Sequence, residues 1–484
     1  MKRYLYLWHR WLGIALCLFM ALWFFSGMVM LYVGYPKLTP REHLAHLPPL
    51  SAQPCCVALA AAMQAADSQR TPTRIRLSTV AGEPRYLFSY AGRENVAVSA
   101  LSGQKLAPSD RAQALASAQQ YAPATPLSYR GLVQEDLWSH SRALDADRPL
   151  QRVELDDAAN TLLYISGQTG EVVRDATALE RGWNYVGAWL HWLYPLRGLG
   201  LDRLWSNLVI YLSLAATLMA LLGAVIGVLR WRFRQPYRSG SRTPYRGFAR
   251  WHHLGGLLFG GLAITWIFSG LMSMNPWQLF GSATPLKVAA YQGGALAPAA
   301  FPLSAAQVLE RFAAQGFRAR ELEWRLVGGA GYVVGFDGAG GTRLLSMADG
   351  AVLNRLPREV LEQAAAAVHP GGVGELLEGY DFYYYARAEQ SMLGHLDKRL
   401  PMLRVKFDDA QQSWLHLDLY TGEVLGVLDR PRRASRWLFA LLHSWDWLPL
   451  LERRPLWDAW MIGLSLGGLL ISVSGVVLGW RRLR

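Results

Sequence analysis

The sequence alternates between long apolar stretches and long polar segments. Four stretches are apolar over about 20 residues or more, which is the length a helix needs to cross a bilayer; they are 11–33, 204–229, 254–274 and 456–480. The first follows Lys2 and Arg3, but it is longer than the apolar core of a signal peptide and no small-residue cleavage site follows it. We therefore expect four transmembrane helices, the first of which is an uncleaved anchor.

The polar segments 35–182 and 276–435 carry the signals of mixed α and β structure. Short runs such as RIRLSTV at 74–80 and RVKFDD at 404–409 alternate as half-buried strands do. Ala-rich helical patterns interrupt the strands around 56–66, 110–120, 304–315 and 357–368. The predicted fold is an α-helical membrane protein with two outer α+β lobes, in which helices pack against antiparallel sheets.

The two halves of the chain resemble each other. WHRWLG at Trp8 aligns with WHHLGG at Trp251 at an offset of 243, and later positions align at an offset of 252. The later matches include His191 with His443, as well as Gly223 and Gly227 with Gly475 and Gly479. Each half reads span, lobe, span, and both start on the same side of the membrane. We therefore expect two parallel repeats related by an axis along the membrane normal.

These patterns divide the chain into seven segments. They are 1–34 (first transmembrane helix), 35–182 (first lobe), 183–234 (interfacial helix and second transmembrane helix), 235–248 (basic loop), 249–275 (third transmembrane helix), 276–435 (second lobe) and 436–484 (interfacial helix and fourth transmembrane helix).

The distribution of charged residues predicts how the chain is oriented in the membrane. Only 18% of the residues are charged, yet the net charge is +13, which could indicate nucleic-acid binding or membrane topology. Thirteen Lys and Arg, with no acidic residue among them, lie before residue 11, in 230–250 and after residue 480; the 49 basic residues less these thirteen equal the 36 acidic ones. The excess therefore indicates cytoplasmic termini, a cytoplasmic loop and external lobes. We therefore expect the protein to lie in the lipid bilayer and to bind no nucleic acid.

Four histidines recur in register across the two halves. His9 and His252 occupy matched positions at the cytoplasmic ends of the first and third spans, and His191 and His443 occupy matched positions on the outer side. Two imidazoles that face each other between apolar helices are the axial ligands that six-coordinate haem iron needs. For a single interfacial histidine, capping or snorkelling is the better interpretation, but four in register favour ligation of haem iron.

Neighbouring residues refine this prediction. Gly13 and Gly256, four residues after the inner histidines, remove side chains from the same helix face and would admit a flat macrocycle. His253 has no counterpart in the first half, and it is expected either to support the cofactor or to replace His252 as a ligand. Zinc is disfavoured because no cysteine or carboxylate shares the cytoplasmic cluster. The absence of Cys-x-x-Cys-His disfavours covalent haem.

The state of two adjacent cysteines remains open. Cys55 and Cys56 lie in the external segment 35–182 and form either a vicinal disulfide or two small unpaired residues.

The span motifs resemble a known family. WHRWLG, WHHLGG followed by WIFSGLMSMNPW, LHSWDW-x-PLLERRPLWD and the closing GVVLGWRR are similar to those of PepSY-associated transmembrane proteins of the bacterial inner membrane, which include haem-containing ferric-siderophore reductases. The resemblance implies four spans, two PepSY-like periplasmic lobes, two haem b groups and reduction of ferric-siderophore iron in the periplasm. It also implies that the haem ligands are His9, His191, His252 and His443.

We therefore expect an oxidoreductase of the ferric-chelate reductase type. A cytoplasmic donor or a quinol would supply the electrons, and a ferric siderophore would accept them. Two alternatives stay open: a quinol-linked b-type cytochrome that serves another periplasmic acceptor, and a non-enzymatic PepSY binding or sensor protein.

Overall fold

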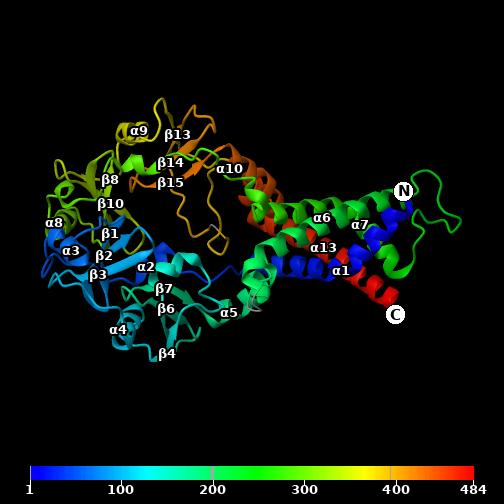
Figure 1. Cartoon of the computed structure of the whole chain (residues 1–484), viewed down its shortest axis with the longest axis horizontal. Helices are drawn as coiled ribbons and strands as arrows, with labels where there is room; N and C mark the ends of the chain where they lie inside the picture. The colour runs from blue at the N-terminus through cyan, green and yellow to red at the C-terminus, as the bar shows by residue number, and fades with distance from the viewer. Residues whose placement is uncertain (1, 198–200, 393) are drawn as a thin grey trace.

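A helical bundle forms one end of the elongated chain and a β-rich part forms the other (Figure 1). The structure is a computed structural model that describes residues 2–197, 201–392 and 394–484. Residue 1, residues 198–200 and residue 393 lie outside the described residues, although the predicted segments 1–34, 183–234 and 276–435 include them. Both termini lie at the end of the bundle that is far from the sheets.

Four helices in the described part of the chain are long and apolar enough to cross a membrane. They are α1 (Lys2–Met30), α6 (Asp202–Arg230), α7 (Gly247–Ser273) and α13 (Arg454–Leu483). The prediction of a multi-pass membrane protein is therefore confirmed. α1 and α7 begin before the predicted spans, because charged residues that limit an apolar stretch do not interrupt the backbone hydrogen bonds of a helix. His9 and His252 consequently lie on rigid helices rather than before them.

The packing of the bundle sets two helices opposite each other. α1 packs against α6 and α13, and α7 packs against the same two helices. α1 and α7 therefore face each other across the bundle. Its buried core includes Met20, Phe24, Met219, Trp266 and Met461.

A seven-stranded antiparallel sheet joins the two predicted lobes. Its order is β11-β10-β9-β8-β1-β2-β3, so strands from segments 35–182 and 276–435 share one sheet. At the joint, Ile75 of β1 lies opposite Trp324 of β8. The strands are β1 (Arg74–Val80), β2 (Glu83–Tyr90), β3 (Glu94–Ser99), β8 (Glu321–Val327), β9 (Ala330–Phe336), β10 (Thr342–Ser346) and β11 (Val352–Leu353).

Each lobe adds a four-stranded antiparallel sheet. The first consists of β4 (Leu127–Val133), β5 (Leu150–Leu155), β6 (Leu162–Ser166) and β7 (Val172–Ala176). The second consists of β12 (Val373–Leu377), β13 (Met402–Lys406), β14 (Trp414–Asp418) and β15 (Val424–Leu428). Together with the helices below, these sheets confirm the prediction of α+β lobes.

The four predicted Ala-rich helices are present as α3 (Leu59–Ala66), α4 (Arg111–Tyr121), α8 (Ala305–Ala314) and α9 (Arg358–Ala366). α3 and α8 bury their apolar faces in one core with the seven-stranded sheet. The shorter helices are α2 (Pro40–His46), α5 (Ala178–Asn184), α10 (Arg430–Ser435), α11 (Leu442–Ser444) and α12 (Leu448–Leu451). The 3₁₀ helices are η1 (Arg142–Asp147), η4 (Pro276–Gln278), η5 (Val288–Gln292) and η6 (Pro298–Ala300). Two π-helical segments, η2 (Tyr185–Trp189) and η7 (Arg436–Leu441), precede the outer histidines.

A buried ion-pair network fastens the joint between the lobes. Arg76 on β1 donates to both carboxylate oxygens of Glu171 at 2.9 Å and to Glu321 on β8 at 3.0 Å. His43 lies 3.4 Å from Glu321. His43, Glu171 and Glu321 lie close enough together to hold a metal ion. However, Arg76 already pairs with the carboxylates of Glu171 and Glu321. We therefore interpret the cluster as an ion-pair network.

Arg76→Ala is expected to lower the free energy of unfolding of the lobes by about 3–5 kcal/mol, because two buried carboxylates lose their partner. Thermal melting of the full-length protein in detergent, followed by near-UV circular dichroism, measures this loss. Arg70→Ala is the matched control, since Arg70 pairs with Asp67 and Glu94 at the exposed surface and its loss should leave the melting temperature unchanged. Equal melting of the two variants would contradict the role of the network.

Two buried carboxyl groups near the joint titrate in opposite directions. Burial, together with the charge of Glu171, raises the pKa of Asp147 from 3.8 to about 6. Burial alone would also raise the pKa of Glu321, but the charge of Arg76, together with the hydrogen bond and charge of His43 and the charge of Arg74, outweighs burial and lowers the pKa from 4.5 to about 2. Asp147 therefore binds its proton more tightly in the folded chain than in the unfolded chain, whereas Glu321 binds its proton more weakly.

The stability contributed by these two groups should pass through a maximum near pH 4. As the pH falls from about 7 to about 4, protonation of Asp147 stabilises the folded state; below about pH 4.5, the contribution of Glu321 is progressively lost. Asp147→Asn should reduce the rise between pH 7 and pH 5 and keep the loss in acid; Asp175, whose pKa burial also raises to about 6, keeps its share of the rise. Melting temperatures at pH 7, 5 and 3 measure both effects, and an unchanged rise in the variant would show that Asp147 does not cause it.

Candidate functional site

The inner histidine pair lies between the two helices that face each other across the bundle. The ring centres of His9 on α1 and His252 on α7 are 6.2 Å apart, with 39° between the ring planes. His9 Nδ1 lies 3.1 Å from the carbonyl oxygen of Met219, and His252 Nδ1 lies 3.0 Å from that of Ile471. A carbonyl oxygen only accepts, so Nδ1 carries the proton in both rings. Nε2 is then the nitrogen with the free lone pair.

The outer histidine pair has the same spacing. His191 lies between η2 and α6, His443 lies in α11, and their ring centres are 6.2 Å apart with 72° between the planes. Their Nδ1 atoms lie 3.0 Å from Ser26 Oγ and 3.1 Å from Ser269 Oγ. Each serine donates its own proton to a carbonyl of its helix, so its oxygen accepts from the imidazole. Nε2 again keeps its lone pair.

Glycines allow the imidazole rings to lie directly against the neighbouring helices. A Cβ atom at Gly223 would lie 2.6 Å from Cε1 of His9, and one at Gly475 would lie 3.4 Å from Cε1 of His252. Gly27 and Gly270 lie beside the outer rings in the same way, at 3.6 Å and 3.8 Å. A side chain at Gly223 would therefore displace His9.

The glycines singled out in the sequence, Gly13 and Gly256, do not contact the imidazole rings. A Cβ atom at Gly13 would approach the sulfur atoms of Cys17 and Met219 at 3.8 Å and 3.9 Å, and one at Gly256 would meet nothing within 4 Å. Neither Cβ atom would meet a histidine ring within 4 Å, because a helical side chain leans toward the N-terminal end of its helix and away from the residue four positions later. That Gly13 and Gly256 leave room for a flat macrocycle stays a prediction. The recurrence of Gly223 and Gly475 at the 252 offset was the sequence signal for the glycines that do contact the rings.

His253 plays a different part from His252. Its Nδ1 lies 2.7 Å from Thr243 Oγ1 and its Nε2 lies 2.9 Å from the carbonyl oxygen of Gly227. Both ring nitrogens are therefore engaged, which leaves His252 as the residue with a free Nε2. His253 connects the α6–α7 loop to the end of α6.

The spacing within each pair fits a metal ion held between two imidazoles. A transition metal binds an imidazole nitrogen at about 2.0–2.1 Å and the ring centre lies about 1.1 Å further out, so two opposite ligands have ring centres about 6.2–6.4 Å apart. The observed 6.2 Å agrees with this value at both levels. Among the described residues, neither level offers the third cysteine, histidine or carboxylate ligand that a tetrahedral site needs.

The two levels are well separated along the bundle. Ser26 marks the outer level on α1, seventeen residues after His9, which corresponds to about 25 Å of helix. On α7, Ser269 follows His252 by the same number of residues. The space between the levels is filled by buried apolar side chains, including Phe24 and Trp266 with ring centres 5.8 Å apart.

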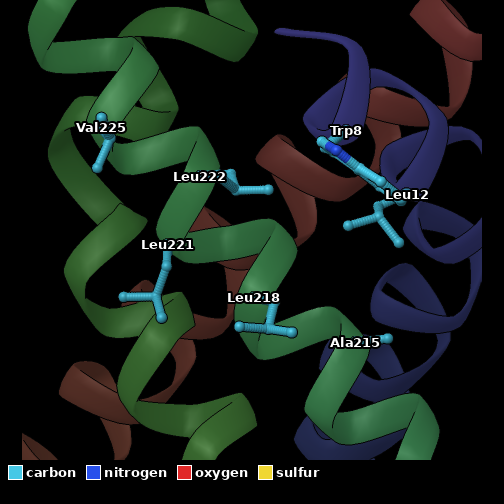
Figure 2. A pocket seen from close by; sticks show the side chains of 7 residues that line it. All are labelled: Trp8, Leu12, Ala215, Leu218, Leu221, Leu222 and Val225. Atoms are coloured by element: carbon cyan, nitrogen blue, oxygen red, sulfur yellow. The ribbon is translucent and has the colours of Figure 1, made fainter. Parts of the chain in front are cut away.

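An apolar cleft of about 380 Å³ lies between α1 and α6 near the inner pair. Figure 2 shows Trp8 and Leu12 projecting from α1 toward Leu218 and Leu222 of α6. Trp8 and Leu12 flank the turn that carries His9. All the lining residues are apolar, and Trp8 and Leu218 are 62% and 50% exposed on the side of the bundle that lipid would cover.

The outer level is also connected to the second lobe, which the sequence analysis did not predict. Asp446, three residues after His443, is buried, accepts a hydrogen bond from the Tyr385 hydroxyl at 2.7 Å and forms an ion pair with Arg387. Both partners belong to the long segment between β12 and β13. The Ser-Trp-Asp that follows His443 and is missing after His191 was the sequence signal for this contact.

Cys55 and Cys56 form a disulfide in the structure, which decides between the two interpretations of this pair. It lies beside the core of the seven-stranded sheet and far from the histidines in the fold.

Comparison with protein-family models identifies the family of the chain. No curated protein matches the chain. The family model of the PepSY-associated TM region matches residues 6–376, which include three of the four membrane helices and His9, His191 and His252. The resemblance inferred from the span motifs is thereby confirmed, and the chain belongs to the PepSY-associated transmembrane family.

Proposed function

We propose that the protein is a membrane oxidoreductase that holds two haem b groups and transfers electrons across the bacterial inner membrane to reduce ferric-siderophore iron. The observation that carries the proposal is the recurrence of an imidazole pair with ring centres 6.2 Å apart at two levels of one bundle. The resemblance of the span motifs to ferric-siderophore reductases supports the choice of acceptor.

The chain's own residues would define both cofactor sites. Nε2 of His9 and His252 would hold the inner haem iron, and Nε2 of His191 and His443 the outer one. Bound haem iron supplies a one-electron redox couple at each level. The hydrogen bonds at Nδ1 orient the rings and increase their basicity, which tunes the affinity for the metal and its potential. The buried apolar residues around and between the levels exclude water.

The charge distribution supports the orientation in this proposal. The thirteen unbalanced basic residues lie in the first ten residues, in 230–250 and after residue 480, and these three regions lie at the same end of the bundle (Figure 1). Basic segments of membrane proteins remain in the cytoplasm. The lobes would then face the periplasm, and the two halves would form parallel repeats that begin on the same side.

Reduction would release the iron from its carrier. Oxygen-rich chelators bind the hard Fe³⁺ ion far more strongly than Fe²⁺, so one electron weakens the complex. The outer histidine pair lies at the end of the bundle that carries the lobes, where a periplasmic complex has access. Asp446 would hold the lobe segment that contains Tyr385 and Arg387 next to this pair.

A second candidate function differs from the first in its electron donor and its electron acceptor. The apolar cleft between α1 and α6 is open to the side that lipid would cover and lies near His9. Such a cleft suits the ring of a lipid-soluble quinol better than a soluble protein donor. The alternative is therefore a quinol-linked b-type cytochrome that serves another periplasmic acceptor.

The purified protein is expected to show the Soret and α bands of b-type haem, with two haems per chain. His9→Ala should remove about half of the haem, because one axial ligand of one site is lost. Gly223→Val should also lower the haem content, because the added side chain displaces the His9 ring. His253→Ala is the matched control and should keep both haems. An absorption spectrum without these bands in the wild type would refute the proposal and favour a non-enzymatic PepSY binding or sensor protein.

Anaerobic reduction followed by addition of a ferric hydroxamate tests the acceptor. The reduced bands should disappear while a ferrous chelator captures one Fe²⁺ for each haem that is reoxidised. Chemically reduced His191→Ala protein should transfer electrons to the ferric complex at least about tenfold more slowly, because the outer ligand is lost. Reoxidation by Cu²⁺ but not by ferric hydroxamates would instead support the second candidate.

A further inference from the structure

The loop between α6 and α7 contains a pocket that the proposed function does not use. The pocket has a volume of about 430 Å³ and lies at the end of the bundle that carries the termini. Its polar wall consists of three hydroxyl residues and two arginines: Ser239, Ser241, Thr243, Arg242 and Arg250. Hydroxyl and guanidinium groups that converge in one pocket are the donors that proteins use for phosphate.

The loop is held in one conformation by its own hydrogen bonds. Tyr237 N donates to the Ser241 carbonyl at 2.9 Å, and Gly240 N donates to the Tyr237 carbonyl at 2.8 Å. Gly240 has a φ of +75°, a conformation that costs other residues energy. The Arg242 guanidinium donates to the Phe233 carbonyl at 2.7 Å. The wall of the pocket is therefore preformed and not a mobile basic tail.

His253 fastens the same loop to the bundle. It bridges Thr243 Oγ1, which lines the pocket, and the carbonyl oxygen of Gly227 on α6. The position of the loop relative to α6 and α7 therefore depends on the buried side chain of His253.

The positive charge of the pocket is not neutralised by the protein. The stretch 230–250 contains seven arginines and no acidic residue. In the described part of the chain, none of these arginines forms an ion pair with a carboxylate. Arg250 is exposed and extends the polar wall of the pocket without such a partner. The pocket therefore favours an anionic ligand.

The remaining walls of the pocket are apolar and lie at the membrane boundary. Trp231 directly follows the last residue of α6, and Leu254 lies on α7 at the start of its apolar stretch. An apolar wall beside a phosphate-binding wall matches a phospholipid, whose phosphate and acyl chains meet at this depth. A free phosphate ion would not need the apolar wall.

We propose that this pocket binds the phosphate of one anionic phospholipid from the cytoplasmic leaflet, with Arg250 and the loop hydroxyls on the headgroup and with Trp231 and Leu254 beside the glycerol and acyl chains. The site is independent of the two histidine pairs, so the proposal stands whether or not the protein binds haem.

Native mass spectrometry of the full-length protein, titrated with phosphatidylglycerol or phosphatidylcholine, tests the proposal. One phosphatidylglycerol should bind more tightly than phosphatidylcholine. Arg250→Gln should weaken that binding about fivefold, the effect expected for one arginine at a membrane surface. Arg238→Gln is the matched control, since it removes the same charge from the neighbouring loop, outside the lining of the pocket, and should change the affinity less than about twofold. Arg250→Lys should retain more of the affinity than Arg250→Gln.

Two outcomes would overturn the proposal. Equal losses in Arg250→Gln and Arg238→Gln would show that lipid binds the diffuse charge of the loop and not the pocket. Saturable binding of inorganic phosphate that depends on Arg250 and displaces phosphatidylglycerol would assign the pocket to a soluble phosphate compound. Thermal melting of each variant separates a loss of the ligand site from a loss of the fold.

Discussion

The hydrogen bonds at Nδ1 of four buried imidazoles are the constraint on which the bundle depends. A polar ring inside an apolar bundle is costly unless its polar atoms have partners. The inner rings use backbone carbonyls of Met219 and Ile471, and the outer rings use Ser26 and Ser269. Each partner is on a neighbouring helix. The histidines therefore fix the rotation and height of the helices as well as the direction of their own free nitrogens.

The two halves of the chain share their buried side-chain contacts but differ in the contacts between the bundle and the lobes. The inner contacts recur: His252 follows His9 by 243 residues, and their partners Met219 and Ile471 are 252 apart. At the joint of the lobes, Glu171 and Glu423 are also 252 apart, and each forms an ion pair with an arginine of the seven-stranded sheet, Arg76 and Arg325. At the outer level the symmetry ends. Asp446 holds a segment of the second lobe, whereas the matching position in the first half is an aromatic residue that packs on tryptophans. An external ligand would therefore meet two unequal sides.

Some parts of the site were accessible to sequence reasoning and others were not. The repeat identified His9, His191, His252 and His443 because identical residues at matched positions of the two halves are visible without a structure. The structure brings them together in two pairs. Gly13 and Gly256 were chosen from spacing on one helix, which carries no information about the facing helix. The role of His253 was similarly hidden, because its partners come from α6 and from the loop.

The sequence by itself determined the four apolar helices, the four Ala-rich lobe helices and part of the strands. It also predicted the orientation from charge and the pairing of the histidines by register. These properties depend on local composition and periodicity. Only the tertiary structure decided that β1 pairs with β8, so that both lobes share one sheet, and that Gly223 and Gly475 lie against the inner rings. Strand neighbours and contacts between helices are set by packing among distant segments, and periodicity shows only which face of an element is buried.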